Sequence, residues 1–193
     1  TKDRIRNHLL IQQGLSKKLE AQGAQLIIWP ESGYRRGNLE RDATVFPPSK
    51  KPLVGDWRAD RNISAKDRMA PQRGFTTPLL FGATSIEPSK KPRWDGDGPT
   101  IPRNTAFLLD SKGRVHGRYD KVFLLVFGEY VPFIEWMPWF YKMVPTAGNL
   151  EPGKDVKVME SNLWPGGPVR LGVLICYEGI LPAFARKLSG QNP

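Results

Sequence analysis

Three short apolar runs constrain the fold of this 193-residue chain more than any other feature. They lie at Leu26–Trp29, Leu79–Thr84 and Val169–Ile175. Runs of this kind, without regular polar alternation, are typical of strands that are buried on both faces of a sheet. A sheet covered on both faces needs helices or a second sheet against it, so we expect a fold of the α/β class.

The sequence predicts a helix near each end of the chain. Asp3–Gln22 predicts an amphipathic helix with Leu9, Leu15 and Leu19 near one face, and Gly23 suits its C-terminal cap. Residues 180–188 predict a second helix. No apolar run reaches the roughly 18 residues that a transmembrane helix requires, so none is expected in this chain.

The middle of the chain combines a hairpin with two long polar stretches. Residues 104–110 and 115–119 predict paired strands around a turn at 111–114. The stretches at about 33–77 and 87–103 are rich in Gly and Pro and predict long loops, which in compact domains usually serve a function or lack order. The 19 Gly and 18 Pro of the chain argue against a helical bundle.

The charge balance favours anionic partners. Twenty-nine Lys and Arg against 19 Asp and Glu give a formal net charge of +10. The basic residues are scattered in pairs, which fits solvated loops first, then attraction to an anionic membrane, and only last a nucleic acid. One cysteine excludes an internal disulfide, and two histidines give little support to a zinc site, so we expect no metal or cofactor.

Cys176 stands where the third apolar run meets a turn. A strand that feeds a tight turn and then a helix presents a side chain at the edge of the sheet, as in a nucleophile elbow. Nearby helix N–H groups favour a thiolate and an oxyanion. The other interpretation is a small buried hydrophobe, and the local context of Cys176 alone favours it.

Glu31 and Lys121 are the residues that could assist a thiol. Glu31 directly follows the first buried run, where burial favours a general base, although a helix cap or a salt bridge is the alternative. Lys121 follows the hairpin and could stabilise negative charge, or it could be an ordinary surface lysine. His8 and His116 lie within a predicted helix and the hairpin, so they give little support to a Cys–His pair.

These segments together resemble the nitrilase superfamily. The order is Trp29-Pro30-Glu31, then Tyr119-Asp120-Lys121, then Ile175-Cys176-Tyr177-Glu178. The resemblance implies an α-β-β-α sandwich with Glu31 as general base, Lys121 as the catalytic lysine and Cys176 as nucleophile. It also implies one catalytic domain over residues 1–193 that is partial, with segments of the family's domain missing at both ends.

One branch of that superfamily fits best. Residues 119–132 and the Cys-Tyr-Glu sequence at Cys176 resemble the apolipoprotein N-acyltransferases. This resemblance implies that Glu129 and Glu178 orient the site, and that the Tyr177 N–H assists Lys121 with the oxyanion. Phe123 and Val126 replace a His and a Pro of the family pattern, which could alter the acyl pocket or the loop.

The implied activity moves a fatty acyl group from a phospholipid to a diacylglyceryl apolipoprotein through a cysteine thioester. It places the catalytic domain at the bacterial inner membrane, on the periplasmic side, with no nucleic acid as partner. The apolar stretch 133–141 then suits a lipid-facing loop, with a core-facing segment as the alternative. A soluble nitrilase-type amidase that uses water and a non-catalytic basic binding module are the rival functions. The side chains expected to face lipid are Phe133, Trp136, Trp139 and Phe140.

Overall fold

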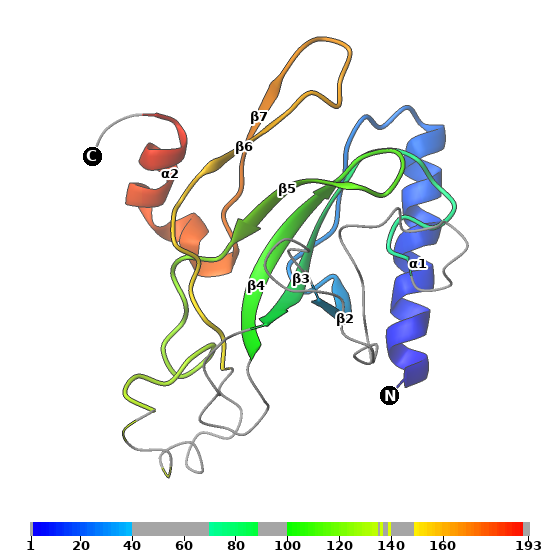
Figure 1. Cartoon of the computed structure of the whole chain (residues 1–193). Helices are drawn as coiled ribbons and strands as arrows, with labels where there is room; N and C mark the ends of the chain where they lie inside the picture. Colours follow the sequence, from blue (N-terminus) through cyan, green and yellow to red (C-terminus); the bar gives the residue numbers. More distant parts are fainter. Residues whose placement is uncertain are drawn as a thin grey trace.

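The computed structural model describes residues 2–39, 70–88, 100–134, 136, 139 and 149–190. Within these ranges the chain forms an N-terminal helix, a main sheet, a small second sheet and a C-terminal helical region (Figure 1). The elements are α1 (Lys2–Ala21), β1 (Ile27–Ile28), β2 (Tyr34–Leu39), β3 (Leu79–Pro88), β4 (Thr100–Leu109), β5 (Val115–Asp120), β6 (Val158–Ser161), β7 (Val169–Gly172), the 3₁₀ helix η2 (Cys176–Ile180) and α2 (Pro182–Leu188).

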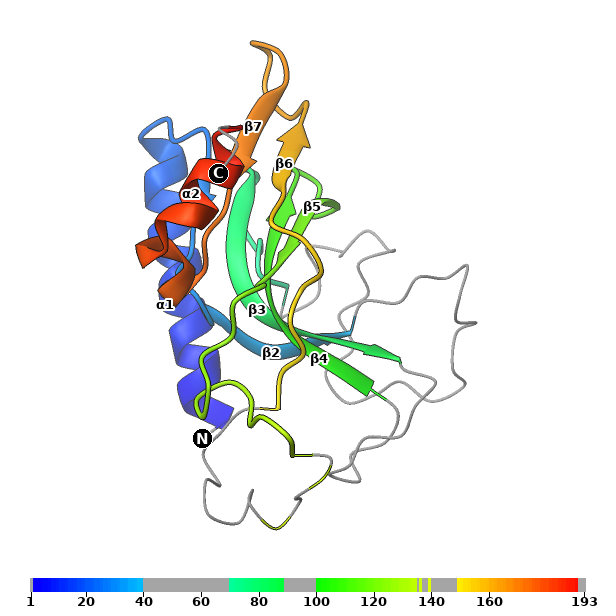
Figure 2. The same ribbon diagram turned by 90° about the vertical axis from the view of Figure 1, so that its left-hand side faces the viewer.

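The main sheet is mixed, with β3 at its centre. β1 and β2 both run parallel to β3, while β4 and β5 continue the sheet in antiparallel order. β6 and β7 form a separate antiparallel hairpin, which extends past one end of the main sheet in both views (Figure 1; Figure 2). α1 lies on one side of the main sheet and α2 on the other.

Two cores lie on opposite faces of the main sheet, because successive side chains of a strand point to opposite faces. Phe81 and Phe107 pack toward α1 with Leu9 and Trp29. The sequence neighbours of these two residues on β3 and β4 point to the other face and pack against the C-terminal half of the chain. That second core contains Leu80, Ala106, Leu108, Tyr119, Met159 and Ile175.

The buried face of α1 differs from the predicted one. Leu9 is buried as predicted, but Leu15 and Leu19 are exposed, and the polar residues Gln13 and Ser16 are buried. Ser16 accepts a hydrogen bond from the indole of Trp29 (3.0 Å), and Gln13 donates to a backbone carbonyl at 2.8 Å. Apolar periodicity missed this face because its polar side chains are satisfied by specific partners.

The strands take residues that were predicted as loop. Tyr34–Leu39 forms β2, β3 continues to Pro88, and β4 begins at Thr100, so both polar stretches are shorter than expected. Their interiors, 40–69 and 89–99, lie outside the described residues. The third apolar run is less regular than predicted, because β7 ends at Gly172 rather than at the residue before Cys176. The prediction of burial on both faces is wrong for two of the runs: residues of β7 alternate between half-buried and exposed, and Ile28 of β1 is 65% exposed. Among the described helices, none has the length and apolar character needed to cross a membrane.

Candidate active site

Glu31 lies in the turn that follows β1. Ser32, its neighbour, adopts a left-handed conformation with φ of +54°, so the chain turns sharply here. Gly82 on β3 lies against this turn, and a Cβ there would come within 2.9 Å of Glu31 Cα. The close approach lets the carboxylate emerge at the end of the sheet with 33% of its side chain exposed.

Lys121 follows β5 directly and is only 1% exposed, so its interpretation as a surface lysine is wrong. Its ammonium lies 2.7 Å from Glu129 Oε2 and 3.7 Å from Glu31 Oε1. Its backbone N–H donates to the carbonyl of Asn104, which fixes the end of β5 against β4. A buried ammonium between two carboxylates is a paired charge, as burial requires.

Glu129 is held by three donors. Lys121 Nζ and the backbone N–H of Leu125 bind Oε2, the latter at 2.9 Å, and Asn104 Nδ2 binds Oε1 at 3.0 Å. Burial opposes ionisation of this carboxyl, but the hydrogen bond from Lys121 and those from the other two donors outweigh it. The pKa of Glu129 is therefore lowered, and the residue stays an anion that pins the lysine.

Cys176 is the first residue of η2 and has φ of +53°, a left-handed conformation that is unusual for a residue with a side chain. Its thiol is exposed, so the alternative of a buried hydrophobe is wrong. Within the described part of the chain, no group accepts a hydrogen bond from the N–H of Tyr177. A strained cysteine beside an open N–H donor is the geometry expected of a nucleophile elbow.

Glu178 ties the cysteine turn to the lysine segment. It is fully buried, and its carboxylate accepts hydrogen bonds from the backbone N–H groups of Val122 (2.7 Å), Phe123 (3.0 Å) and Ile175 (2.9 Å). The hydroxyl of Tyr119 donates to both oxygens at 3.0 Å. Burial and the charge of Glu178 raise the pKa of Tyr119 well above its usual value, so the hydroxyl remains a donor.

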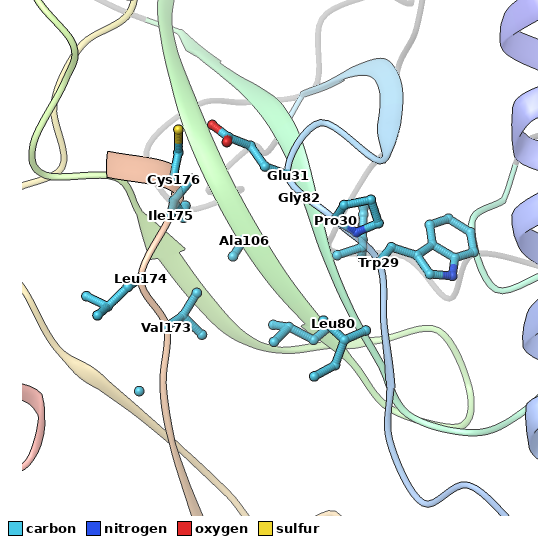
Figure 3. A pocket seen from close by; sticks show the side chains of 13 residues that line it. Trp29, Pro30, Glu31, Leu80, Gly82, Ala106, Val173, Leu174, Ile175 and Cys176 are labelled. Atoms are coloured by element: carbon cyan, nitrogen blue, oxygen red, sulfur yellow. The ribbon is translucent and has the colours of Figure 1, made fainter. Parts of the chain in front are cut away.

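A cavity of about 340 Å³ connects Glu31 with Cys176. In Figure 3 the carboxylate and the thiol extend to the same end of this pocket, and apolar side chains such as Leu80 and Val173 line the rest. The structure thus brings Glu31, Lys121 and Glu129 into direct contact. Cys176 lines the pocket together with Glu31, and its sulfur makes no hydrogen bond to any residue that the structure describes.

The segment after Lys121 is strongly apolar at its surface. Phe133 is 74% exposed and Trp136 86%, and Trp139 is exposed as well, while Phe140 lies outside the described residues. The core-facing alternative is therefore wrong for Phe133, Trp136 and Trp139, but it holds for Ile134 of the same stretch, which is buried.

The two residues that depart from the family pattern are also partly exposed. Phe123 stacks on Tyr177, with 5.9 Å between ring centroids and 17° between ring planes. Val126 is 42% exposed. Phe123 therefore places an aromatic ring beside the cysteine turn at the position where the family pattern has a histidine.

Sequence reasoning missed Asn104, whose amide nitrogen lies 2.6 Å from Glu31 Oε1 and 3.0 Å from Glu129 Oε1. A signal was present: Asn104 is a polar residue at an inward position of a predicted strand, in step with Ala106 and Leu108. A buried polar side chain on the face of a core requires a partner.

The fold resembles that of a solved structure. A solved structure of a mutant amidase of the nitrilase superfamily from Nesterenkonia AN1 matches 97% of this chain and 56% of its own, with a TM-score of 0.52 and 21% identity. The fold is therefore nitrilase-like, as predicted.

The family follows from the sequence. Residues 3–192 match the carbon-nitrogen hydrolase family, and the chain belongs to it. Two proteins named apolipoprotein N-acyltransferase, from Geobacter metallireducens and Bdellovibrio bacteriovorus, are 38% and 40% identical to this chain over 91% and 79% of its length. The chain spans 28% and 27% of those relatives. The similarity to N-acyltransferases that the motifs predicted is confirmed.

Proposed function

We propose that this chain carries the catalytic site of an apolipoprotein N-acyltransferase in which Glu31, Lys121 and Cys176 act together. One observation carries the proposal. The pocket that holds the exposed, strained Cys176 also holds the carboxylate of Glu31, which is paired with the buried Lys121. The names of the relatives favour acyl transfer among the reactions that such a site can perform.

The first half-reaction forms a thioester. Glu31 takes the proton of the Cys176 thiol, and the thiolate attacks the ester carbonyl carbon of a phospholipid. The ammonium of Lys121 and the open N–H of Tyr177 stabilise the oxyanion. The carbon–oxygen bond of the ester then breaks, and the lysophospholipid leaves with the proton that Glu31 returns.

The second half-reaction transfers the acyl group. The α-amine of a diacylglyceryl apolipoprotein attacks the thioester carbonyl, the new carbon–nitrogen bond forms, and the carbon–sulfur bond breaks. Glu31 accepts the proton that the amine loses and passes it to the departing thiolate of Cys176. The thiol is restored, and the product is an N-acylated lipoprotein.

The exposed aromatic side chains of the segment after Lys121 support a lipid donor. Phe133, Trp136 and Trp139 project from the segment that begins at Lys121, and exposed Trp and Phe side chains favour the membrane interface. The net charge of +10 adds attraction to anionic headgroups, on the order of 1 kcal/mol for each well-placed Lys or Arg. The proposed location is the periplasmic side of the bacterial inner membrane.

The test is intact-mass spectrometry of the full-length protein after incubation with phospholipid vesicles. We expect a fatty-acyl adduct on Cys176 that hydroxylamine removes, that Cys176→Ala abolishes, and that an apolipoprotein peptide discharges. Glu160→Gln is the matched control, because Glu160 is exposed and, among the residues that the structure describes, pairs with the exposed Arg170. A folded wild-type protein that hydrolyses small amides and never forms this adduct would establish the amidase instead.

A further inference from the structure

Asn104 joins the two carboxylates of the site. We propose that Asn104 is a positioning residue that holds Oε1 of Glu31, so that Oε2 is the atom that takes the thiol proton of Cys176. This inference rests on the role of Glu31 as base in the proposed function. It concerns a residue of β4 that belongs neither to the Glu–Lys–Cys set nor to the supporting residues expected from the sequence.

The contacts form a closed ring. Asn104 Nδ2 lies 2.6 Å from Glu31 Oε1 and 3.0 Å from Glu129 Oε1. Lys121 Nζ joins the same two side chains, at 3.7 Å from Glu31 Oε1 and 2.7 Å from Glu129 Oε2. Two donors and two acceptors therefore alternate, and Glu31 takes part in the ring through Oε1 alone.

The orientation of the Asn104 amide follows from its partners. Ionised carboxylates can only accept hydrogen bonds, so the amide nitrogen, with two hydrogens, must face them and the amide oxygen must point away. The side chain is buried, and its backbone carbonyl accepts the N–H of Lys121 at 2.8 Å. β4 thus fixes the amide and the lysine in one geometry.

The second oxygen of Glu31 is left for chemistry. Among the residues that the structure describes, none donates a hydrogen bond to Oε2. Glu31 and Cys176 line the same pocket, and their reactive groups extend to the same end of it (Figure 3). A base must be aimed as well as ionised, and a misplacement of about 1 Å can lower a rate about 100-fold. The ammonium of Lys121 lies 3.7 Å from Oε1, which is too long for a hydrogen bond. The 2.6 Å bond from Asn104 therefore sets the direction of the carboxylate.

The experiment measures the reactivity of the Cys176 thiol in the full-length protein. Iodoacetamide labelling is followed with time in the tryptic peptide 171–186, which contains Cys176 and needs no lipid to report. The variants are Asn104→Leu, which removes the donor, and Asn104→Asp, which keeps the size and exchanges the donor for an acceptor. Ser85→Ala is the control, since Ser85 is a fully buried polar residue on the opposite face of the same sheet.

We expect Asn104→Leu to label about 10- to 100-fold more slowly than wild type, and Ser85→Ala at the wild-type rate. In the acyl-transfer assay, Asn104→Leu should lower kcat with KM unchanged, because Asn104 reaches the substrate only through Glu31. The double variant Glu31→Gln with Asn104→Leu should react no more slowly than Glu31→Gln alone. The rate of Asn104→Asp relative to Asn104→Leu should rise as the pH falls, because a protonated Asp regains one donor.

Three results overturn the inference: wild-type labelling in a folded Asn104→Leu or Asn104→Asp protein, additive effects with Glu31→Gln, or a pH-independent ratio of the two variants. If Asn104 had a purely structural role, its effect would add to that of Glu31→Gln and the ratio of the two variants would not depend on pH. Labelling does not depend on phospholipid, so the two proposals fail separately. A wild-type protein with Asn104-dependent labelling and no acyl adduct refutes only the acyl-transfer proposal.

Discussion

Replacement of Glu178 by Gln tests the connection between the cysteine turn and the lysine segment. The two side chains have nearly the same shape, so the substitution changes hydrogen bonding and charge with little change in packing. In the wild type, Oε1 accepts from Val122 and Phe123, Oε2 accepts from Ile175, and Tyr119 donates to both oxygens.

The expected loss of stability follows from counting donors. A Gln amide offers one acceptor oxygen, which can serve Val122 and Phe123, and its NH₂ group then faces the N–H of Ile175. A buried N–H without a partner costs about 1–3 kcal/mol, and the remaining bonds change from a charged to a neutral acceptor, at up to about 1 kcal/mol each. We expect Glu178→Gln to lower the free energy of unfolding by about 3–5 kcal/mol, a large part of a typical total of about 5–15 kcal/mol.

Urea denaturation followed by tryptophan fluorescence measures this difference. The exposed carboxylate of Glu160 provides the control, since Glu160→Gln should leave the midpoint unchanged. Labelling of Cys176 should also slow in Glu178→Gln under native conditions, because the turn loses its bond at Ile175. A loss below about 1 kcal/mol would refute the reasoning, since it would mean that these donors are satisfied without the carboxylate.

Three further predictions test the strain, the close packing and the electrostatics of the fold. Cys176→Gly should be more stable than Cys176→Ala by about 1 kcal/mol in the same denaturation assay, the reverse of the usual order, because φ at this position is +53°; equal stabilities would contradict a left-handed turn. Gly82→Ala should destabilise the protein by about 1–3 kcal/mol and slow Cys176 labelling, because the new Cβ would meet backbone atoms at 2.9 Å and 3.0 Å; an unchanged melting temperature would argue against this contact. Glu20 has a pKa lowered below 4.5, first by the backbone N–H of Thr76, so its contribution to stability is present above that value and is lost as the pH falls through the lower, folded-state pKa; the stability difference between wild type and Glu20→Gln should therefore shrink on acidification, and a constant difference would exclude this linkage.

The main strands and the order of the site residues along the chain could be predicted because their sequence signals are local. Apolar runs end at or just before Glu31 and Cys176, and the hairpin ends just before Lys121. Burial, by contrast, is a property of the assembled sheet. Nothing in the sequence near Lys121 shows that its ammonium is buried between two carboxylates, one 90 residues earlier in the chain and the other 8 residues later.

The partner residues could not be predicted because they depend on register. Asn104 reaches Glu31 only because β4 pairs with β3, which pairs with β1, so three strands set one hydrogen bond of 2.6 Å. The buried polar face of α1 was not predicted for the same reason, since the burial of Ser16 depends on its contact with the indole of Trp29. Periodicity identifies the apolar residues that need burial, but not the polar residues that find partners there.

The left-handed conformation of Cys176 shows how the site stays rigid at an exposed position. Such a conformation costs about 1–2 kcal/mol for a residue with a Cβ, and it persists only where the surrounding structure holds it. Here the holding group is Glu178, which binds the N–H immediately before the cysteine and two N–H groups immediately after the lysine. One buried carboxylate therefore fixes both segments, so a change that loosens the strained turn must also release the backbone that carries Lys121. Thiol reactivity and the global stability of the domain should for this reason fall together in variants of Glu178.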